Sequence, residues 1–343
     1  MSEPHFWQGG QSWQALLLSP LLTLAAMLYR LAEATNRRLT KPRPAAIPVI
    51  CVGNFTAGGA GKSPTVRFLA MHLSEPAGNT PAILSRGYGG TLAGPVKIDP
   101  VQHTARQAGD EPLMLAAYGA TPLNVYVGAD RHATAAMAAQ NGHGWAIKDD
   151  GFQNPAMRHA FNLLVVDGTV GLGNGRLLPA GPLRQPLPVA LDHTDAVLVL
   201  GEERHHTLSG LHMACETRNI PVYRGHIIAQ APATGTDKVL GWCAIAHPEK
   251  FRTSLLDAGY EIAGFTGFAD HHNLSEAQAQ NLLDRAAAEN LRLISTAKDM
   301  ARLHGSPPHS ACAALAEATQ VLEIDLQIED WPDLRDRLLA VLA

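Results

Sequence analysis

The stretch from Pro48 to Leu69, PVICVGNFTAGGAGKSPTVRFL, constrains the fold of this chain more than any other. Val49–Val52 form a short apolar run, which predicts a strand buried on both faces. A glycine-rich segment follows, and a helix is expected to begin near Pro64, because proline is tolerated in the first turn of a helix. A strand, a glycine-rich loop and a helix in this order are typical of a phosphate-binding P-loop.

The loop has the chemistry that a nucleotide site needs. Its glycines leave successive backbone N–H groups free to surround an anion, and the amino-terminal end of the following helix adds partial positive charge. Lys62 would reach the β- and γ-phosphates, and the Ser63 hydroxyl would bind Mg²⁺. The usual GxxxxGK[ST] pattern has a glycine where this chain has threonine. The alternative is a glycine-rich turn that binds nothing. The expected nucleotide-binding residues are Thr56, Ala57, Gly58, Gly59, Ala60, Gly61, Lys62 and Ser63.

Length and composition exclude several classes of protein. The 343 residues suffice for two domains, and 46% hydrophobic with 17% charged residues suits a globular chain. The net charge of -4 gives no reason to expect nucleic acid as a partner. No two of the four cysteines have CxxC spacing, so we expect reduced, mostly buried thiols rather than a zinc site or a disulfide framework.

The amino-terminal part of the chain is apolar from Ala15 to Leu31. This run is shorter than the ~20 residues of a transmembrane helix, and Pro20 interrupts it. It also lacks the basic start and small-residue cleavage site of a signal peptide. An apolar helix with a basic flank predicts a segment lying in or on the membrane surface; the alternative is a helix packed on the protein's own core. The flanking basic residues are Arg30, Arg37, Arg38, Lys41 and Arg43.

Short apolar runs alternate with helical stretches through the rest of the chain, which predicts an α/β fold with a doubly wound, mostly parallel sheet. We expect a membrane-associated helix and linker over 1–44, a P-loop core domain over 45–222 and a smaller α/β domain over 223–343. Ser275 is a candidate N-cap for a helix ending near Glu289. The expected strands are 49–52, 82–84, 96–98, 124–127, 145–147, 161–166, 196–200, 239–245 and 291–295.

Three acidic sites compete for the roles that a P-loop kinase requires, a ligand to Mg²⁺ and an acceptor for the proton of a hydroxyl. They are the pair Asp149 and Asp150, then Asp167, and Asp110 with Glu111 in GDEP. The more apolar strand before it favours Asp167 as the metal ligand, although each motif alone is also typical of a turn or cap. His271 and His272 in FADHH, preceded by Asp270, are a further candidate pair, because a neighbouring carboxylate can orient a histidine as a base.

These motifs occur together, and in this order, in a known family. The chain resembles the tetraacyldisaccharide 4'-kinases, the lipid A 4'-kinases of Gram-negative bacteria. The resemblance runs from the amino-terminal apolar helix to about Leu303. The segments that carry it are VGNFTAGGAGKSP (52–64), SRGYGG (85–90), AGDEP (108–112), DDGFQN (149–154), VVDGTVGLGNGRLLPAGPLR (165–184), AIAHPEKF (244–251), FADHH (268–272) and AKD (297–299).

The resemblance implies a P-loop lipid kinase that uses ATP and Mg²⁺. Its reaction would be transfer of the γ-phosphate to the 4'-hydroxyl of the lipid A disaccharide 1-phosphate, at the cytoplasmic face of the inner membrane. No protein partner is implied. A membrane-binding helix suits such an acceptor, because lifting acyl chains out of a bilayer costs ~0.8 kcal/mol per CH₂.

The resemblance also assigns roles to residues. Lys62 and Ser63 match the phosphate lysine and the Mg²⁺ hydroxyl, and Asp149 with Asp150 match the acidic pair at the metal, in place of Asp167. Asp110 matches the catalytic base and His271 its partner. We expect Arg86 and Asn54 to contact substrate.

Three positions depart from the family pattern: Gln185 and Ala297 replace carboxylates, and Lys148 replaces an apolar residue. Two other functions remain open. One is a membrane-associated P-loop ATPase or switch protein without a lipid acceptor, and the other is a cytosolic kinase of a small metabolite.

Overall fold

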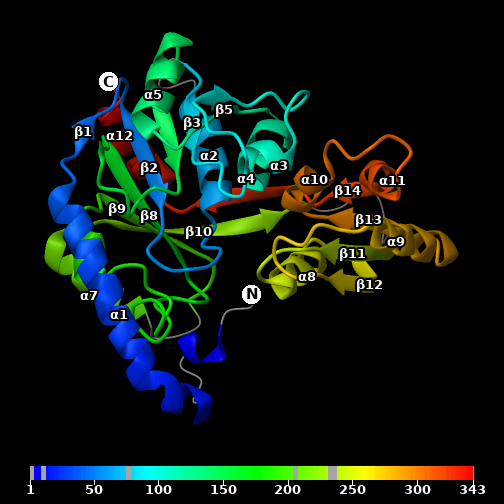
Figure 1. Ribbon diagram of the computed structural model, residues 1–343, viewed down its shortest axis with the longest axis horizontal. Coiled ribbons are helices and arrows are strands. Elements are labelled where there is room, and N and C mark those ends of the chain that lie inside the picture. The colour runs from blue at the N-terminus through cyan, green and yellow to red at the C-terminus, as the bar shows by residue number, and fades with distance from the viewer. Residues whose placement is uncertain are drawn as a thin grey trace. The chain divides into compact units, whose positions relative to one another are not determined.

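The computed structural model describes residues 4–8, 13–74, 79–119, 121–203, 208–230 and 238–342, and the chain forms two compact units (Figure 1). The larger unit comprises Glu3–Leu84, Asp130–His226 and Leu326–Ala343. The smaller unit comprises Ser85–Ala129 and Ile227–Asp325. The expected amino-terminal segment 1–44 includes residues 1–3 and 9–12, which lie outside the described part of the chain.

This division differs from the contiguous domains expected over 45–222 and 223–343. Residues 85–129 belong with the carboxyl-terminal part of the chain, and 326–343 belong with the P-loop. The difference has a physical reason: residues 110–117 form a helix that packs on a helix nearly 190 residues later in sequence (Asp110–Ala117 on Ala297–Leu303). Composition marks linkers, but it does not reveal which distant segments share a core.

The larger unit is built on strands in the order β15-β10-β9-β8-β2-β6-β3. The pairs from β10 to β3 are parallel, as the alternation of strands and helices predicts. A separate parallel pair joins β1 (Arg43–Pro44) and β7 (Met157–Arg158). The strand bounds are β2 Val49–Gly53, β3 Ala82–Ser85, β6 Ala146–Asp149, β8 Phe161–Asp167, β9 Ala196–Leu200, β10 Val222–Ala229 and β15 Ile324–Ile328.

Strand β2 lies between β6 and β8, and all of its residues are buried. This confirms the prediction of a strand buried on both faces. Val52, near the end of β2, is aligned with Asp149 at the end of β6. Because parallel strands end at the same edge of a sheet, the loop after β2 and the acidic pair after β6 begin side by side.

Helices cover this sheet and continue its core. Residues of α6 and α7 join a buried cluster with Cys51 of β2 and Val197 of β9. Helix α2 packs on β2 and β6, and its Phe68 stacks edge-on against Trp331 of α12 with ring centroids 4.8 Å apart. The helix bounds are η1 His5–Gln8, α1 Trp13–Leu39, α2 Lys62–Ser74, α5 Arg131–Gln140, α6 Leu187–Leu191, α7 Ser209–Arg218 and α12 Trp331–Ala340.

Helix α1, the long blue helix in Figure 1, extends beyond the predicted apolar run at both ends and contains Pro20. From residue 19 onward its large apolar side chains are mostly open to solvent, although Ala26 is buried. Arg37 donates to Glu33 and to the buried Gln185, with N–O distances of 2.8 and 2.9 Å, which joins the second half of α1 to the larger unit. Among the described residues, no helix is both long and apolar enough to cross a membrane.

The smaller unit has its own parallel sheet in the order β12-β11-β13-β14. Alternate residues of β11 enter two cores: Leu240 and Trp242 pack with α9, α10 and α11, whereas Val239 and Cys243 pack with α8. Residues 85–129 add the antiparallel pair β4–β5 and two helices. The bounds are β4 Val96–Lys97, α3 Ala105–Ala108, α4 Asp110–Ala117, β5 Asn124–Val127, β11 Lys238–Cys243, α8 Pro248–Asp257, β12 Glu261–Gly267, α9 Glu276–Ala288, β13 Arg292–Ser295, α10 Ala297–Leu303, α11 Ala311–Ala318 and β14 Thr319–Val321.

Several local predictions are confirmed. The chain is an α/β protein with mostly parallel sheets, and each expected strand is present within two residues of its predicted bounds. Ser275 caps α9, because its hydroxyl accepts from the Gln278 N–H at 3.3 Å. All four cysteines are buried and unpaired, and burial raises the pKa of Cys51 to about 11, which keeps its thiol protonated.

Lys148 is a fully buried lysine in β6, directly before the acidic pair. Its Nζ donates to the Gly151 carbonyl at 3.2 Å and to His159 Nε2 at 3.0 Å. His159 Nδ1 in turn donates to Asn162 Oδ1 at 2.7 Å, so the ring is neutral; burial and the nearby Lys148 lower its pKa to about 4. Lys148, one of the three positions that depart from the resembled family, therefore stabilises the turn after β6 by its hydrogen bond to the Gly151 carbonyl.

We predict that Lys148→Met lowers the free energy of unfolding by about 1–3 kcal/mol, because the buried Gly151 carbonyl and His159 Nε2 lose their donor. Chemical denaturation checks this. The matched control is Lys97→Met at an exposed lysine, which should change stability by no more than about 0.5 kcal/mol. Equal or greater stability of Lys148→Met would show that desolvation of the ammonium outweighs its hydrogen bonds.

Candidate functional site

The loop between β2 and α2 has the backbone conformation that its glycines predict. Gly58 and Gly61 have φ values of 101° and 84°, in the region that side chains with a Cβ rarely adopt. Gly59 has open space where a Cβ would stand. Because glycine has no side chain, this part of the loop stays uncovered. Helix α2 begins at Lys62, which places the positive end of a helix at the loop.

A second segment holds this loop in place. The Ala57 N–H donates to the Pro182 carbonyl at 2.7 Å, and the Arg184 N–H donates to the Phe55 carbonyl at 2.7 Å. Thr56 and Leu183 form an isolated antiparallel bridge between these two contacts. The motif LLPAGPLR, whose role was not evident from the sequence, thus packs beside the phosphate loop and holds its backbone by hydrogen bonds.

The Lys62 side chain is directed by groups at the same edge of the sheet. Its Nζ donates to Asn54 Oδ1 at 3.1 Å and lies 3.8 Å from Asp150 Oδ2. The Arg184 guanidinium lies 3.7 Å from the same Asp150 oxygen. Asn54 is buried, and its Nδ2 donates to the Thr56 carbonyl at 2.8 Å. Asn54 therefore braces the loop and the lysine, a role that the expectation of a substrate contact did not include.

The acidic pair has donors suited to Mg²⁺. Asp149 is buried at the end of β6, whereas Asp150 has a left-handed φ of 48° that turns its partly exposed carboxylate toward the lysine. Carboxylate and hydroxyl oxygens are hard ligands, and Mg²⁺ in kinase sites needs only one or two carboxylates beside the substrate phosphates. Among the described residues no cluster of three or more His, Cys, Asp or Glu could hold a metal ion.

Asp167, the other candidate for the metal, closes a turn. Its Oδ1 accepts from the Thr169 N–H at 2.9 Å and from the Thr169 hydroxyl at 2.6 Å. Asp167 thus has a structural role in this turn, and Mg²⁺ binding by the acidic pair stays a prediction. Gln185 also has a defined contact, since its Oε1 accepts from Arg37 of α1.

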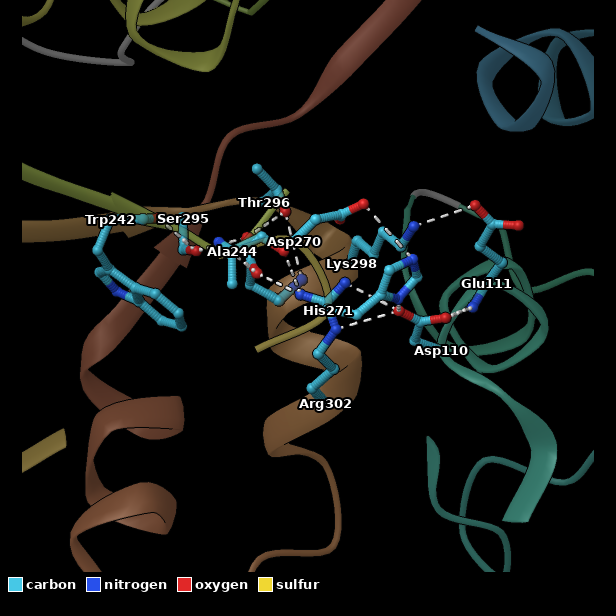
Figure 2. Close-up of polar contacts among 11 residues, drawn as sticks. Asp110, Glu111, Trp242, Ala244, Asp270, His271, Ser295, Thr296, Lys298 and Arg302 are labelled. Atoms are coloured by element: carbon cyan, nitrogen blue, oxygen red, sulfur yellow. Dashed lines mark hydrogen bonds and ion pairs between the residues drawn. The ribbon is translucent and has the colours of Figure 1, made fainter. Parts of the chain in front are cut away.

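The smaller unit holds the second group of functional candidates, around Asp110 at the start of α4 (Figure 2). His271 Nδ1 donates to Asp110 Oδ2 at 2.9 Å, so the expected pairing of these residues is present. Arg302 of α10 donates to the same oxygen from Nε at 3.1 Å and from Nη2 at 2.8 Å. Asp110 Oδ1 accepts from the Glu111 N–H at 3.0 Å.

The charges around Asp110 keep its carboxyl ionised. Burial would raise the pKa of Asp110, but the positive charges of Lys298 and Arg302, with His271 beside them, outweigh burial and lower it. Lys298 Nζ is also paired with Glu111 at 3.1 Å. His271 has a left-handed φ of 57°, and its ring is about half exposed, so the Asp110–His271 pair is open to a ligand.

The SRGYGG motif lies against the segment that leads into Asp110. Thr91 and Leu92, just after the motif, donate their N–H groups to the Gln107 carbonyl at 2.9 and 3.0 Å. Gly90 is required by this approach, because a Cβ there would lie 2.4 Å from that carbonyl oxygen. Arg86 is exposed, so its guanidinium is available for an anion, and its contact with substrate stays a prediction.

Two residues of the cluster have roles that sequence reasoning did not assign. His272, the second histidine of DHH, bonds Gln278 at 2.9 Å and stacks on Phe268, so it is structural. Arg302 was missed, although one signal was available. It follows Asp299 of the AKD motif by three residues, and on a helix that spacing puts both side chains on one face.

The chain is similar to proteins of one known family. The family described as "Tetraacyldisaccharide-1-P 4'-kinase" matches residues 14–343. A protein named tetraacyldisaccharide 4'-kinase from Parvibaculum lavamentivorans is 43% identical over 335 residues, covering 97% of this chain and 96% of that protein. One of the same name from Rhodospirillum centenum is 43% identical over 348 residues, covering 100% of this chain and 97% of that protein.

A solved structure shares the fold. The crystal structure titled "apo" form LpxK from Aquifex aeolicus in complex with ATP has a TM-score of 0.72 to this chain at 22% identity, and it covers 96% of this chain and 100% of that one. The family match extends over almost the whole sequence, including every motif described above. This chain therefore belongs to the tetraacyldisaccharide-1-phosphate 4'-kinase family.

Proposed function

We propose that this protein transfers the γ-phosphate of ATP to the 4'-hydroxyl of tetraacyldisaccharide 1-phosphate, forming the bisphosphorylated lipid of lipid A biosynthesis. The observation that carries the proposal is the glycine loop with Lys62 beside Asp150, in a chain matched along its length by 4'-kinases. The ATP in the crystal structure of the Aquifex aeolicus relative supports the choice of nucleotide.

The loop and the start of α2 would bind the phosphates of ATP. Amides of residues 58–61 would surround the anion, Lys62 would bond the β- and γ-phosphates, and its present partner Asn54 keeps the ammonium at the loop. Ser63, Asp149 and Asp150 would hold Mg²⁺, which neutralises charge on the phosphates when bound. Arg184 lies beside Asp150 and would add a further positive charge for the γ-phosphate.

Asp110 and His271 would receive the proton of the 4'-hydroxyl. Because the transition state of phosphoryl transfer is loose, the hydroxyl loses its proton late, and orientation matters more than base strength. A carboxylate kept ionised by neighbouring cations satisfies that requirement. Arg86, exposed beside the Asp110 segment, would bind a phosphate of the substrate.

Helix α1 would bring the enzyme to its lipid at the cytoplasmic face of the inner membrane. Five large apolar side chains of one stripe are 57% to 68% exposed, which is unusual for a soluble surface. Exposed Arg30, Arg38, Lys41 and Arg43 flank the stripe and suit anionic head groups. Neither nucleic acid nor a protein partner is needed for this reaction. The residues of the stripe are Leu21, Leu24, Met27, Leu28 and Leu31.

We predict that the purified protein moves labelled γ-phosphate from ATP-Mg²⁺ onto tetraacyldisaccharide 1-phosphate in mixed micelles. Lys62→Met should lower the rate by roughly 10²–10³, because the variant loses one positive charge that neutralises the transferred phosphoryl group. Lys97→Met, at an exposed lysine, is the matched control and should keep the wild-type rate. ATP hydrolysis without labelled lipid would contradict the proposal and support a membrane-associated ATPase or switch protein. Phosphorylation of soluble metabolites alone would support a cytosolic kinase.

A second prediction concerns the stripe on α1. Replacing Leu24, Leu28 and Leu31 by glutamine should weaken binding to phosphatidylethanolamine/phosphatidylglycerol vesicles at least about tenfold, since burying one leucine contributes about 1.5–3 kcal/mol. Vesicle flotation measures this. Met213→Gln removes one exposed apolar side chain from α7 of the same unit and is the control. Unchanged flotation of the triple variant would refute the role of α1.

A further inference from the structure

Arg302 is almost fully buried, with a side chain 7% exposed, and four hydrogen bonds hold its guanidinium (Figure 2). Nε and Nη2 donate to Asp110 Oδ2. Nη1 donates to the Ala244 carbonyl at 2.7 Å and to Asp299 Oδ1 at 2.8 Å. The arginine thus spans from the carboxylate at the start of α4 to the core of the second sheet.

Asp299 fixes the inner side of that arginine. Its Oδ1 accepts from the Ala244 N–H at 2.9 Å, and its Oδ2 accepts from the Thr296 hydroxyl at 2.6 Å. Burial raises the pKa of Asp299, but these donors and Arg302 stabilise its ionised form. A buried charge with this many partners has one allowed position, so the fold around β11 and α10 sets where the guanidinium points.

The same peptide also positions the histidine. The Ala244 carbonyl, which accepts from Arg302, accepts from the His271 N–H at 3.2 Å as well. Ala244 therefore sets the backbone of one member of the pair directly and the carboxylate of the other through Arg302. The positions of both Asp110 and His271 therefore depend on one peptide group, that of Ala244 just after β11.

We propose that Arg302 is the positioning residue of the Asp110–His271 pair, because its forked contact with Oδ2 fixes the carboxylate in the orientation that bonds His271. The inference rests on the proposed function for its link to catalysis. Asp110 is the first residue of α4 and its other oxygen already bonds the next N–H, so without the fork the carboxylate would turn to cap its own helix. A lysine ammonium offers a point charge and no planar fork, so it is no substitute.

The proposal predicts a change in pH dependence. Asp110 faces Lys298 and Arg302 of α10 and His271, while Glu111 and Asp270 are the nearby negative groups. The native pKa of Asp110 is lowered, so its ionised form persists as the pH falls. Removing the Arg302 charge raises this pKa, and the acid limb of the kcat/KM profile should move to higher pH.

The test compares Arg302→Lys, which keeps the charge, with Arg302→Met, which removes it. We expect kcat of both to fall about 10²-fold from misplacement of the reacting groups, with the KM for ATP within about twofold. Only Arg302→Met should shift the acid limb upward. Arg252→Met, at an exposed arginine of α8 in the same unit, is the matched control and should behave as wild type.

Two results would overturn the proposal: wild-type kcat in Arg302→Lys, or an unshifted acid limb in a folded Arg302→Met. Failure of the proposed function is distinguishable, because wild type itself would then not phosphorylate the lipid. In that case the titration of Asp110 can be followed without activity by ¹³C NMR of the aspartate carboxyls in the full chain. The Asp110 signal is assigned by its loss in Asp110→Asn. The Asp110 carboxyl should titrate at higher pH in Arg302→Met, and an unchanged titration would reject the proposal.

Discussion

A charge taken out of water needs a partner, and the candidate groups of this chain follow that constraint. Arg302 bonds two carboxylates and a carbonyl, Lys148 bonds a carbonyl and a neutral histidine, and Lys62 bonds an amide oxygen. Removing one member of such a set leaves the others buried and unpaired. The positions of the functional side chains are therefore consequences of how the two cores satisfy their buried ions.

The two cores supply different parts of the chemistry. The larger unit carries the groups proposed to bind the phosphates, because β2 and β6 end at one sheet edge and present the loop and the acidic pair there. The smaller unit carries the pair proposed to accept the proton, because α4 packs on α10 and brings Asp110 to Arg302.

Much of the local structure was predictable from short-range patterns in the sequence. Val49–Val52 predicted β2 because a run of branched apolar residues suits a doubly buried strand, and Ser275 predicted the start of α9 through its capping chemistry. What the sequence could not supply was long-range packing. The fork of Arg302 on Asp110 joins residues 192 apart, and no local propensity reports such a contact.

We propose that Asp110 acts on the proton of the acceptor and not on the binding of nucleotide. This proposal is tested most directly by measuring single-turnover phosphoryl transfer and ATP affinity in one preparation of Asp110→Asn, which keeps the size of the side chain. The account predicts a rate lower by about 10²–10⁴ with the ATP dissociation constant within about threefold of wild type. A loss of ATP affinity as large as the loss of rate would contradict it.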